Sequence, residues 1–175
     1  MKTILITLFF VILVVPMDAS GAWEVFYFPE GGFSLSMPNE PSKRSYKVKA
    51  AKGLVETFSF QSCLLECEIG YTATFADFGI NSNIAKNPEE AMEFAKSGAQ
   101  RSTNGKLTFE AFIKHKDIVG KEHKFSVETH QGLYVLIQRV FLVDGRIYEI
   151  NVSTPIKYQF MPEHNIFLDS LKIGR

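Results

Sequence analysis

The sequence predicts an α+β fold in which helices flank an antiparallel β-sheet. Residues 133–153 contain two apolar, β-branched runs on either side of Asp144-Gly145. An Asp-Gly pair between such runs is a strong hairpin signal, because a type I′ turn needs a positive φ at both central residues. Residues 33–37 alternate between apolar and polar, which is the period of a half-buried strand. A helix-start signal follows at residues 87–90, so strands and helices are both expected.

The hairpin at residues 133–153 is expected to form the central pair of the sheet. A two-residue turn places Phe141 opposite Tyr148 and Arg139 opposite Ile150. One face then carries mainly apolar side chains, namely Ile137, Phe141, Tyr148, Ile150 and Val152. The other face mixes apolar residues with Gln138, Glu149 and Asn151. One dry and one mixed face predict that the sheet is covered on both sides.

Other parts of the chain predict further strands. Residues 33–37 predict a short strand near an edge of a sheet, because Pro38 closes it. Residues 39–52 are polar and basic, and a solvated loop or edge strand is favoured over a patch for an anionic surface. Residues 54–62 and 69–75 predict a second hairpin.

The two cysteines lie at the end of this second hairpin. In an exported chain, a disulfide between Cys63 and Cys67 is the default expectation. If the cysteines sit opposite each other, Phe58 and Phe60 lose their apolar partners, and a bulge at Gly70 would restore them. A redox-active pair is less favoured, because the spacing is C-x3-C and no thioredoxin-like pattern surrounds it.

Two helices are expected. The first should run over residues 88–100, with Asn87 as N-cap and proline at the first helical position. Its buried face is expected to contain Ala91, Phe94, Ala95 and either Gly98 or Ala99. Residues 157–169 predict a second helix, and residues 170–173 a last short strand.

The N-terminus is typical of a secretory signal. A basic start precedes an apolar run at residues 4–15, which Pro16 ends, and small residues follow. Cleavage is expected after Ala22, which leaves a single domain over residues 23–175. The alternative is an uncleaved anchor, but the run is shorter than the roughly 20 residues that span a bilayer. We therefore expect a secreted or periplasmic protein with no transmembrane segment in its mature chain.

Composition and motifs exclude several classes of function. The chain has 19 basic and 19 acidic residues, so it lacks the basic surface of a nucleic-acid binder. It contains no G-x-S-x-G, P-loop or G-x-G-x-x-G motif. No catalytic residue and no cofactor is therefore expected, although a hydrolase with a dispersed site stays open as a third hypothesis.

His123, Glu128 and His130 are close in sequence but do not predict a metal site. On one strand the two histidines would lie about 23 Å apart, and Glu128 would face away from His123. Zinc needs its ligands near 2.1 Å, so ordinary surface histidines are expected and no metal. The glycosylation sequon at Asn151 lies inside the best predicted strand and is taken as chance.

Arg139 is the one candidate for a special role in the central hairpin. It falls among apolar residues on the drier face, and a buried guanidinium needs a partner. Glu128 and Glu149 are within sequence reach. A structural ion pair is favoured, and a ligand-binding arginine in a cleft is the alternative.

The order of these elements resembles the PsbP-like superfamily from about Trp23 onward. The resemblance rests on the segments GGFSLSMPNEP, YTATFADF, NPEEA, YVLIQRVFLVDGRIYEINVSTP and FLDSLKI, and on the turn at Val119-Gly120. It implies an antiparallel sheet flanked by helices, an α/β/α sandwich, in a family whose members are mostly non-enzymatic. The short signal resembles those of exported bacterial members. No functional residue of photosynthetic members matches a position here.

Signal, missing motifs and resemblance together predict an exported, non-enzymatic accessory or protein-interaction domain with a protein partner in the cell envelope. The alternative is a small-ligand-binding protein that uses a cleft between sheet and helix. In that case Arg139 or residues 43–52 would contact an anion.

Overall fold

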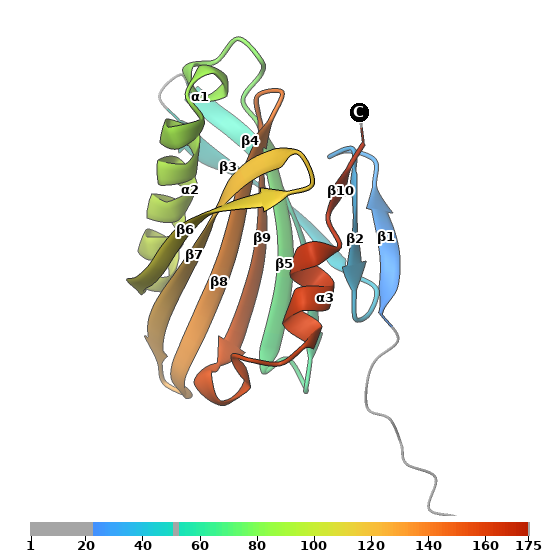
Figure 1. The fold of residues 1–175 in the computed structure, drawn as a ribbon, viewed down its shortest axis with the longest axis vertical. Helices are drawn as coiled ribbons and strands as arrows, with labels where there is room; N and C mark the ends of the chain where they lie inside the picture. The colour runs from blue at the N-terminus through green and yellow to red at the C-terminus, as the bar shows by residue number, and fades with distance from the viewer. Residues whose placement is uncertain (1–22, 51–52, 175) are drawn as a thin grey trace, which may run out of the picture.

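The computed structural model describes residues 23–50 and 53–174, so the expected signal and its cleavage site lie outside the described residues. Seven strands form one antiparallel sheet in the order β3-β4-β5-β9-β8-β7-β6 (Figure 1). Their bounds are β3 Ser42–Ala50, β4 Gly53–Leu64, β5 Ile69–Asp77, β6 Lys106–His115, β7 Ile118–Thr129, β8 Gly132–Val143 and β9 Arg146–Pro155. The predicted hairpin, β8 and β9, lies at the centre of this sheet, and β3 is an edge strand.

The register of the central hairpin is confirmed. Phe141 pairs with Tyr148 and Arg139 with Ile150. Asp144 and Gly145 adopt φ values of 50° and 81°, as a type I′ turn requires. The turn chemistry and the alternation of side chains therefore agree, and they fix which residues face each side of the sheet.

The register of the second hairpin differs from the expectation. Cys63 pairs with Gly70, not with Cys67, and Phe58 pairs with Phe75 without any bulge at Gly70. The rings of Phe58 and Phe75 stack with centroids 5.0 Å apart, so apolar pairing decides the register. Cys67 lies in the turn that follows β4, and the Cys63–Cys67 disulfide is present with a Cα–Cα distance of 4.8 Å.

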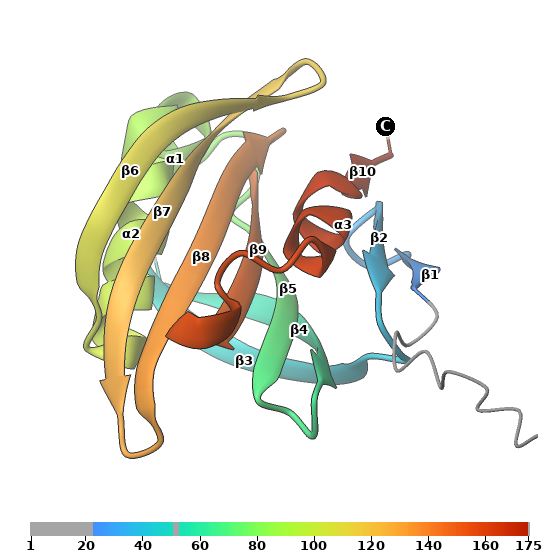
Figure 2. The same cartoon turned by 60° about the horizontal axis from the view of Figure 1, so that its bottom comes forward.

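A second, three-stranded sheet has the order β1-β2-β10, with β1 Glu24–Phe28, β2 Phe33–Met37 and β10 Lys172–Ile173. The expectation that residues 33–37 lie near an edge is wrong, because β2 is the middle strand. Its alternate residues Phe33, Leu35 and Met37 are fully buried in the main core. This small sheet packs with helix α3 on one face of the large sheet (Figure 2).

Helices lie on both faces of the large sheet. After the short α1, Asn83–Lys86, helix α2 spans Pro88–Thr103 and packs on β7 and β8. The Asn87 side chain accepts a hydrogen bond from the Glu90 N–H, which confirms the predicted N-cap. The helix runs three residues beyond the predicted end at residue 100, because left-handed Asn104 terminates it. Ala91 and Ala95 are buried as predicted.

The helix expected at residues 157–169 is divided in two. A 3₁₀ turn, η1, covers Ile156–Tyr158, and α3 covers Glu163–Asp169 directly after Pro162. Proline fits the start of a helix but not its interior, which explains the division. No helix among the described residues is long and apolar enough to cross a membrane.

Candidate functional site

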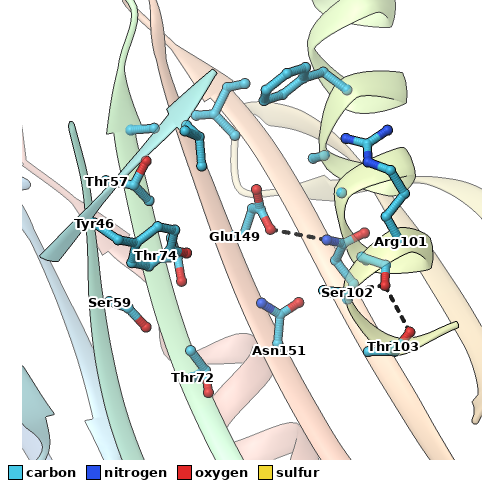
Figure 3. A pocket seen from close by; sticks show the side chains of 18 of the residues that line it. Tyr46, Thr57, Ser59, Thr72, Thr74, Arg101, Ser102, Thr103, Glu149 and Asn151 are labelled. Atoms are coloured by element: carbon cyan, nitrogen blue, oxygen red, sulfur yellow. Dashed lines mark hydrogen bonds between the residues drawn. The ribbon is translucent and has the colours of Figure 1, made fainter. Parts of the chain in front are cut away.

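A cleft of about 700 Å³ lies between helix α2 and strands β3, β4, β5, β8 and β9 (Figure 3). It is on the mixed face of the sheet, opposite the face that packs against α3. Helix α2 covers the β7 and β8 side of this face, so the β4, β5 and β9 side forms the floor of the cleft.

The floor of the cleft is polar because three strands each alternate small polar and apolar residues. The polar members line the cleft and the apolar ones enter the main core. The polar lining residues of these strands are Thr57, Ser59, Gln61, Thr72, Thr74, Glu149, Asn151 and Ser153. On the α2 side the wall is mostly apolar or small, formed by Phe94, Ala95, Gly98 and Ala99 together with the rim residues Arg101, Ser102 and Thr103.

Two polar atoms of the floor are buried without a hydrogen-bond partner. They are Oγ1 of Thr57 and Oδ1 of Asn151. Thr57 is only 4% exposed. A buried polar atom without a partner costs roughly 1–3 kcal/mol, so each of these atoms has an unused hydrogen-bonding capacity.

Glu149 is the one carboxylate among the described lining residues. Its Oε2 accepts a hydrogen bond of 3.1 Å from Nε2 of Gln138, and no described cation lies within ion-pair distance of it. Burial raises the pKa of Glu149 to about 7, against the opposing effect of the Gln138 hydrogen bond. The side chain can therefore accept or donate a proton near neutral pH.

Gln138, which donates to Glu149, belongs to a polar row that crosses six strands. Cross-strand pairing aligns Gln61, Thr72, Asn151, Gln138, His123 and Glu110 from β4 to β6. Nδ1 of His123 lies 3.0 Å from Oε1 of Gln138. Because that oxygen can only accept, Nδ1 carries the proton, and the amide nitrogen of Gln138 is turned toward Glu149.

His123 corrects the expectation of an ordinary surface histidine, because its side chain is fully buried between β7 and α2. Burial lowers its pKa, so the ring is neutral at pH 7. Glu128 and His130 are exposed and lie elsewhere, so the structure does not bring the three together. Residues 23–50 and 53–174 contain no group of three or more His, Cys, Asp or Glu side chains that could hold a metal ion.

An ion cluster around the buried Lys121 joins the first turns of α2 to the far edge of the sheet. The ammonium of Lys121 contacts Glu89, Glu93 and Glu110, and Lys96 contacts the last two. Burial alone would lower the pKa of Lys121, but hydrogen bonds to Glu89 and Glu110 outweigh burial and raise it. The two ammonium groups are paired with three carboxylates, and such mutual pairing is typical of a structural cluster.

Arg139 lies on the α3 face of the sheet, outside the described lining of the cleft. Its guanidinium donates to Glu122 at 2.8 Å and to Asp169 at 2.6 Å. Its partners are therefore these two residues and not Glu128 or Glu149. The arrangement ties α3 to the sheet and has the geometry of a structural ion pair.

The basic segment contributes to the rim of the cleft. Tyr46, Val48 and Lys49 of β3 line it, whereas Lys43 pairs with Glu30. Asn151, the sequon residue, lies half-buried on the floor. Sequence reasoning missed the hydroxyl residues of β4 and β5, although the alternation T-F-S-F-Q at residues 57–61 and Y-T-A-T-F at residues 71–75 is the signal that could have found them.

No protein-family model and no curated protein sequence matches the chain. Among solved structures, it is similar to the solution structure of cyanobacterial PsbP (CyanoP) from Synechocystis sp. PCC 6803, with a TM-score of 0.59 and 10% sequence identity over 87% of this chain and 93% of that chain. Protein PA94 from Pseudomonas aeruginosa, a protein of unknown function, gives a TM-score of 0.40 and 11% identity over 82% and 88% of the two chains. That second similarity is too low to indicate a common fold. The similarity to CyanoP shows that this chain has a PsbP-like fold.

Proposed function

We propose that this chain is an exported accessory domain that binds a small molecule in the cleft and catalyses no reaction. The observation that carries the proposal is the cleft of about 700 Å³, whose floor leaves the buried Thr57 hydroxyl without a partner. Its volume falls within the roughly 300–1,000 Å³ of typical small-ligand sites. The expected signal and the Cys63–Cys67 disulfide support export, because disulfides persist in oxidising compartments.

The arrangement of the cleft supports binding rather than hydrolysis. Among the described residues, no hydroxyl of the cleft hydrogen-bonds to a histidine, so no nucleophile is activated in the usual way. Acid–base cleavage of a glycosidic bond needs a pair of carboxyl groups. Glu149 is the one carboxylate of the described lining, and its orientation is fixed by an amide.

Blocking the cleft tests the proposal. Gly98 lies on the cleft side of α2, and a Cβ atom there meets no atom within 4 Å. Gly98→Leu should narrow the cleft beside Phe94 and Ala95 and also stabilise the helix, because leucine has a higher helix propensity than glycine. Gln100→Leu, on the same helix but outside the described lining, is the matched control.

The measurement is a thermal-shift screen of a chemically diverse small-molecule set against the purified mature chain. We expect at least one compound that raises the Tm of the wild type and of Gln100→Leu but not of Gly98→Leu. A set in which every active compound shifts all three proteins equally would overturn the proposal, and so would a set without active compounds.

A second candidate function is binding of a protein partner in the cell envelope. Strand β1 is an edge strand of the small sheet, and its Val25 and Tyr27 side chains are 66% and 68% exposed. A partner strand could add to such an edge through main-chain hydrogen bonds. Pull-downs from envelope extract should then retain the partner with wild type and lose it with Val25→Glu/Tyr27→Glu. Equal retention by both proteins would exclude this surface.

A further inference from the structure

The two sides of the cleft differ in chemistry, and this difference restricts what it can hold. The floor offers hydroxyl and amide groups from β4, β5 and β9, whereas the α2 wall presents Phe94 and the small residues Ala95, Gly98 and Ala99 (Figure 3). At the mouth, Tyr46 on β3 is 48% exposed and offers a flat apolar ring. A matching occupant has one polar edge and one apolar face.

The unpaired atoms of the floor specify the polar edge further. Oδ1 of Asn151 accepts hydrogen bonds, and the Thr57 hydroxyl can accept or donate. Glu149 stands next to Asn151 on the same face of β9, and one of its carboxyl oxygens accepts from Gln138. The cleft therefore best fits a ligand that mainly donates hydrogen bonds. The neighbouring hydroxyls of Ser59, Thr72 and Thr74 can also pair with ligand groups that both donate and accept.

Other ligand classes fit less well. Arg101 and Lys49 at the rim would attract an anion, but on the floor it would lie beside Glu149 and be repelled when that group is ionised. A purely apolar molecule would leave Thr57 and Asn151 without partners. A polycation would meet Arg101 and Lys49 at the rim.

We propose, on the basis of the proposed function, that the ligand is a neutral polyhydroxy compound of one or two sugar rings. Its hydroxyl edge lies on β4, β5 and β9, where Asn151 and Glu149 of β9 accept hydrogen bonds from it and the Thr57 hydroxyl of β4 completes the set. Its carbon–hydrogen face lies against α2 and the ring of Tyr46, because apolar surface on both partners is then removed from water.

The test is a titration of the isotope-labelled mature chain, followed by ¹⁵N–¹H spectra. The probes are the neutral disaccharides maltose, cellobiose and trehalose, with citrate, spermidine and laurate as an anion, a polycation and an apolar compound. The informative variant is Thr57→Val, which keeps the shape of the side chain and removes only its hydroxyl. Ser45→Ala on β3, outside the described lining, is the control.

We expect at least one disaccharide to bind saturably, with shifts in residues of β4, β5, β9 and α2. Thr57→Val should weaken this binding about five- to tenfold, the effect of one lost hydrogen bond, without lowering Tm, because the hydroxyl has no partner in the protein. Ser45→Ala should bind as the wild type does. Disaccharide binding that Thr57→Val leaves unchanged would overturn the assignment of the ligand.

The remaining outcomes separate the ligand class from the proposed function. Saturable binding of citrate, spermidine or laurate in the cleft, with none of the disaccharides, would overturn the polyhydroxy class and keep the cleft as a binding site. If no probe shifts the spectrum, and Gly98→Leu behaves as the wild type in the thermal-shift screen, both the ligand class and the proposed function are overturned.

Discussion

The amide of Gln138 donates a hydrogen bond to Glu149 over 3.1 Å, and its other end is fixed by His123 at 3.0 Å. This relationship holds a carboxyl group in place on the floor of the cleft without neutralising it. An amide hydrogen bond favours the carboxylate, but burial without a cation disfavours it more strongly, which is why the pKa of Glu149 rises to about 7.

The raised pKa of Glu149 predicts a specific dependence of stability on pH. Between the ordinary carboxyl value of 4.5 and about 7, the folded protein binds more protons at this site than the unfolded chain. The free energy of unfolding contributed by Glu149 is therefore lost as pH rises through this range, by up to roughly 3 kcal/mol. Urea unfolding from pH 4.5 to 8 measures this loss. The difference in free energy of unfolding between the wild type and Glu149→Gln should change with pH by this amount.

His164, whose pKa is lowered by burial, lies on the opposite face of the sheet and titrates equally in both proteins. His123 shares Gln138 with Glu149, so Gln138→Leu provides a control in which this link is removed. Glu68→Gln, at an exposed ion pair, should follow the wild-type profile within about 0.5 kcal/mol. Parallel profiles for wild type and Glu149→Gln would show that this carboxyl group titrates normally.

The ion pair of Arg139 predicts a loss of stability without a loss of ligand binding. Arg139→Met removes the closer of the two cations beside Glu122, whose side chain is 13% exposed, and leaves Lys124 at 3.5 Å. Because Asp169 is 62% exposed and recovers its hydration, we expect a decrease of roughly 2–3 kcal/mol in the free energy of unfolding, below the cost of breaking a fully buried pair. Urea unfolding at pH 7 provides the measurement.

Two further variants separate the charge effect from packing. Arg139→Met/Glu122→Gln should recover part of the loss, because no uncompensated buried charge is left. Lys114→Met, at the exposed pair with Asp117, should change stability by less than about 0.5 kcal/mol. A loss of cleft binding in a folded Arg139→Met protein would instead favour a ligand role for this residue.

The sequence predicted the features that local chemistry controls. Asp144-Gly145 determined the central turn, and this turn determined which residues of β8 and β9 face each side. The register predicted for the second hairpin was wrong, because it was based on the proximity of the cysteines and not on the pairing of Phe58 with Phe75. Apolar pairing acts along the whole hairpin, whereas a disulfide also tolerates one cysteine in the turn.

The cleft depends on strand order, which the sequence did not supply. Gln138, Glu149 and Asn151 were placed on the mixed face correctly, but their neighbours on β4, β5 and β7 became known only from the structure. His123 was expected at the surface, because the sequence does not show that Gln138 of the adjacent strand pairs with it in the interior. Non-local pairing of this kind leaves no local sequence signal.

The central turn predicts different costs for two glycines of similar φ. Gly145 and Gly79 have φ values of 81° and 75°. A Cβ at Gly145 would lie 2.6 Å from the backbone carbon of Gly79, whereas a Cβ at Gly79 meets nothing within 4 Å. Gly79→Ala should therefore cost about 1 kcal/mol through backbone strain alone, and Gly145→Ala about 2 kcal/mol or more. Equal losses of stability for the two variants in thermal unfolding would show that the backbone at Gly79 moves away from the new Cβ at residue 145 without cost.

Processing of the N-terminus predicts that the exported protein begins at Trp23. Small residues at Ser20 and Ala22 fit the positions before a signal-peptidase cut. N-terminal sequencing of the protein from a secreting host gives the answer, and Ala22→Leu should block cleavage at this bond. An intact Met1 form in the membrane fraction of the wild type would favour an uncleaved anchor.

The disulfide predicts a modest loss of stability when it is removed. Cys63 and Cys67 enclose a short loop, and in the loop-entropy model a closed loop of about five residues stabilises the folded state by roughly 2 kcal/mol. Cys63→Ser/Cys67→Ser should lower the free energy of unfolding by about this amount and keep the fold, because the aromatic core around Phe33, Phe60 and Phe75 is independent of the bridge. Reductant should destabilise the wild type equally and leave the double variant unchanged. Intact mass after alkylation of protein isolated from the envelope tests the premise, since two alkylated thiols would show that the apolar pairing of β4 and β5 holds this hairpin without the bridge.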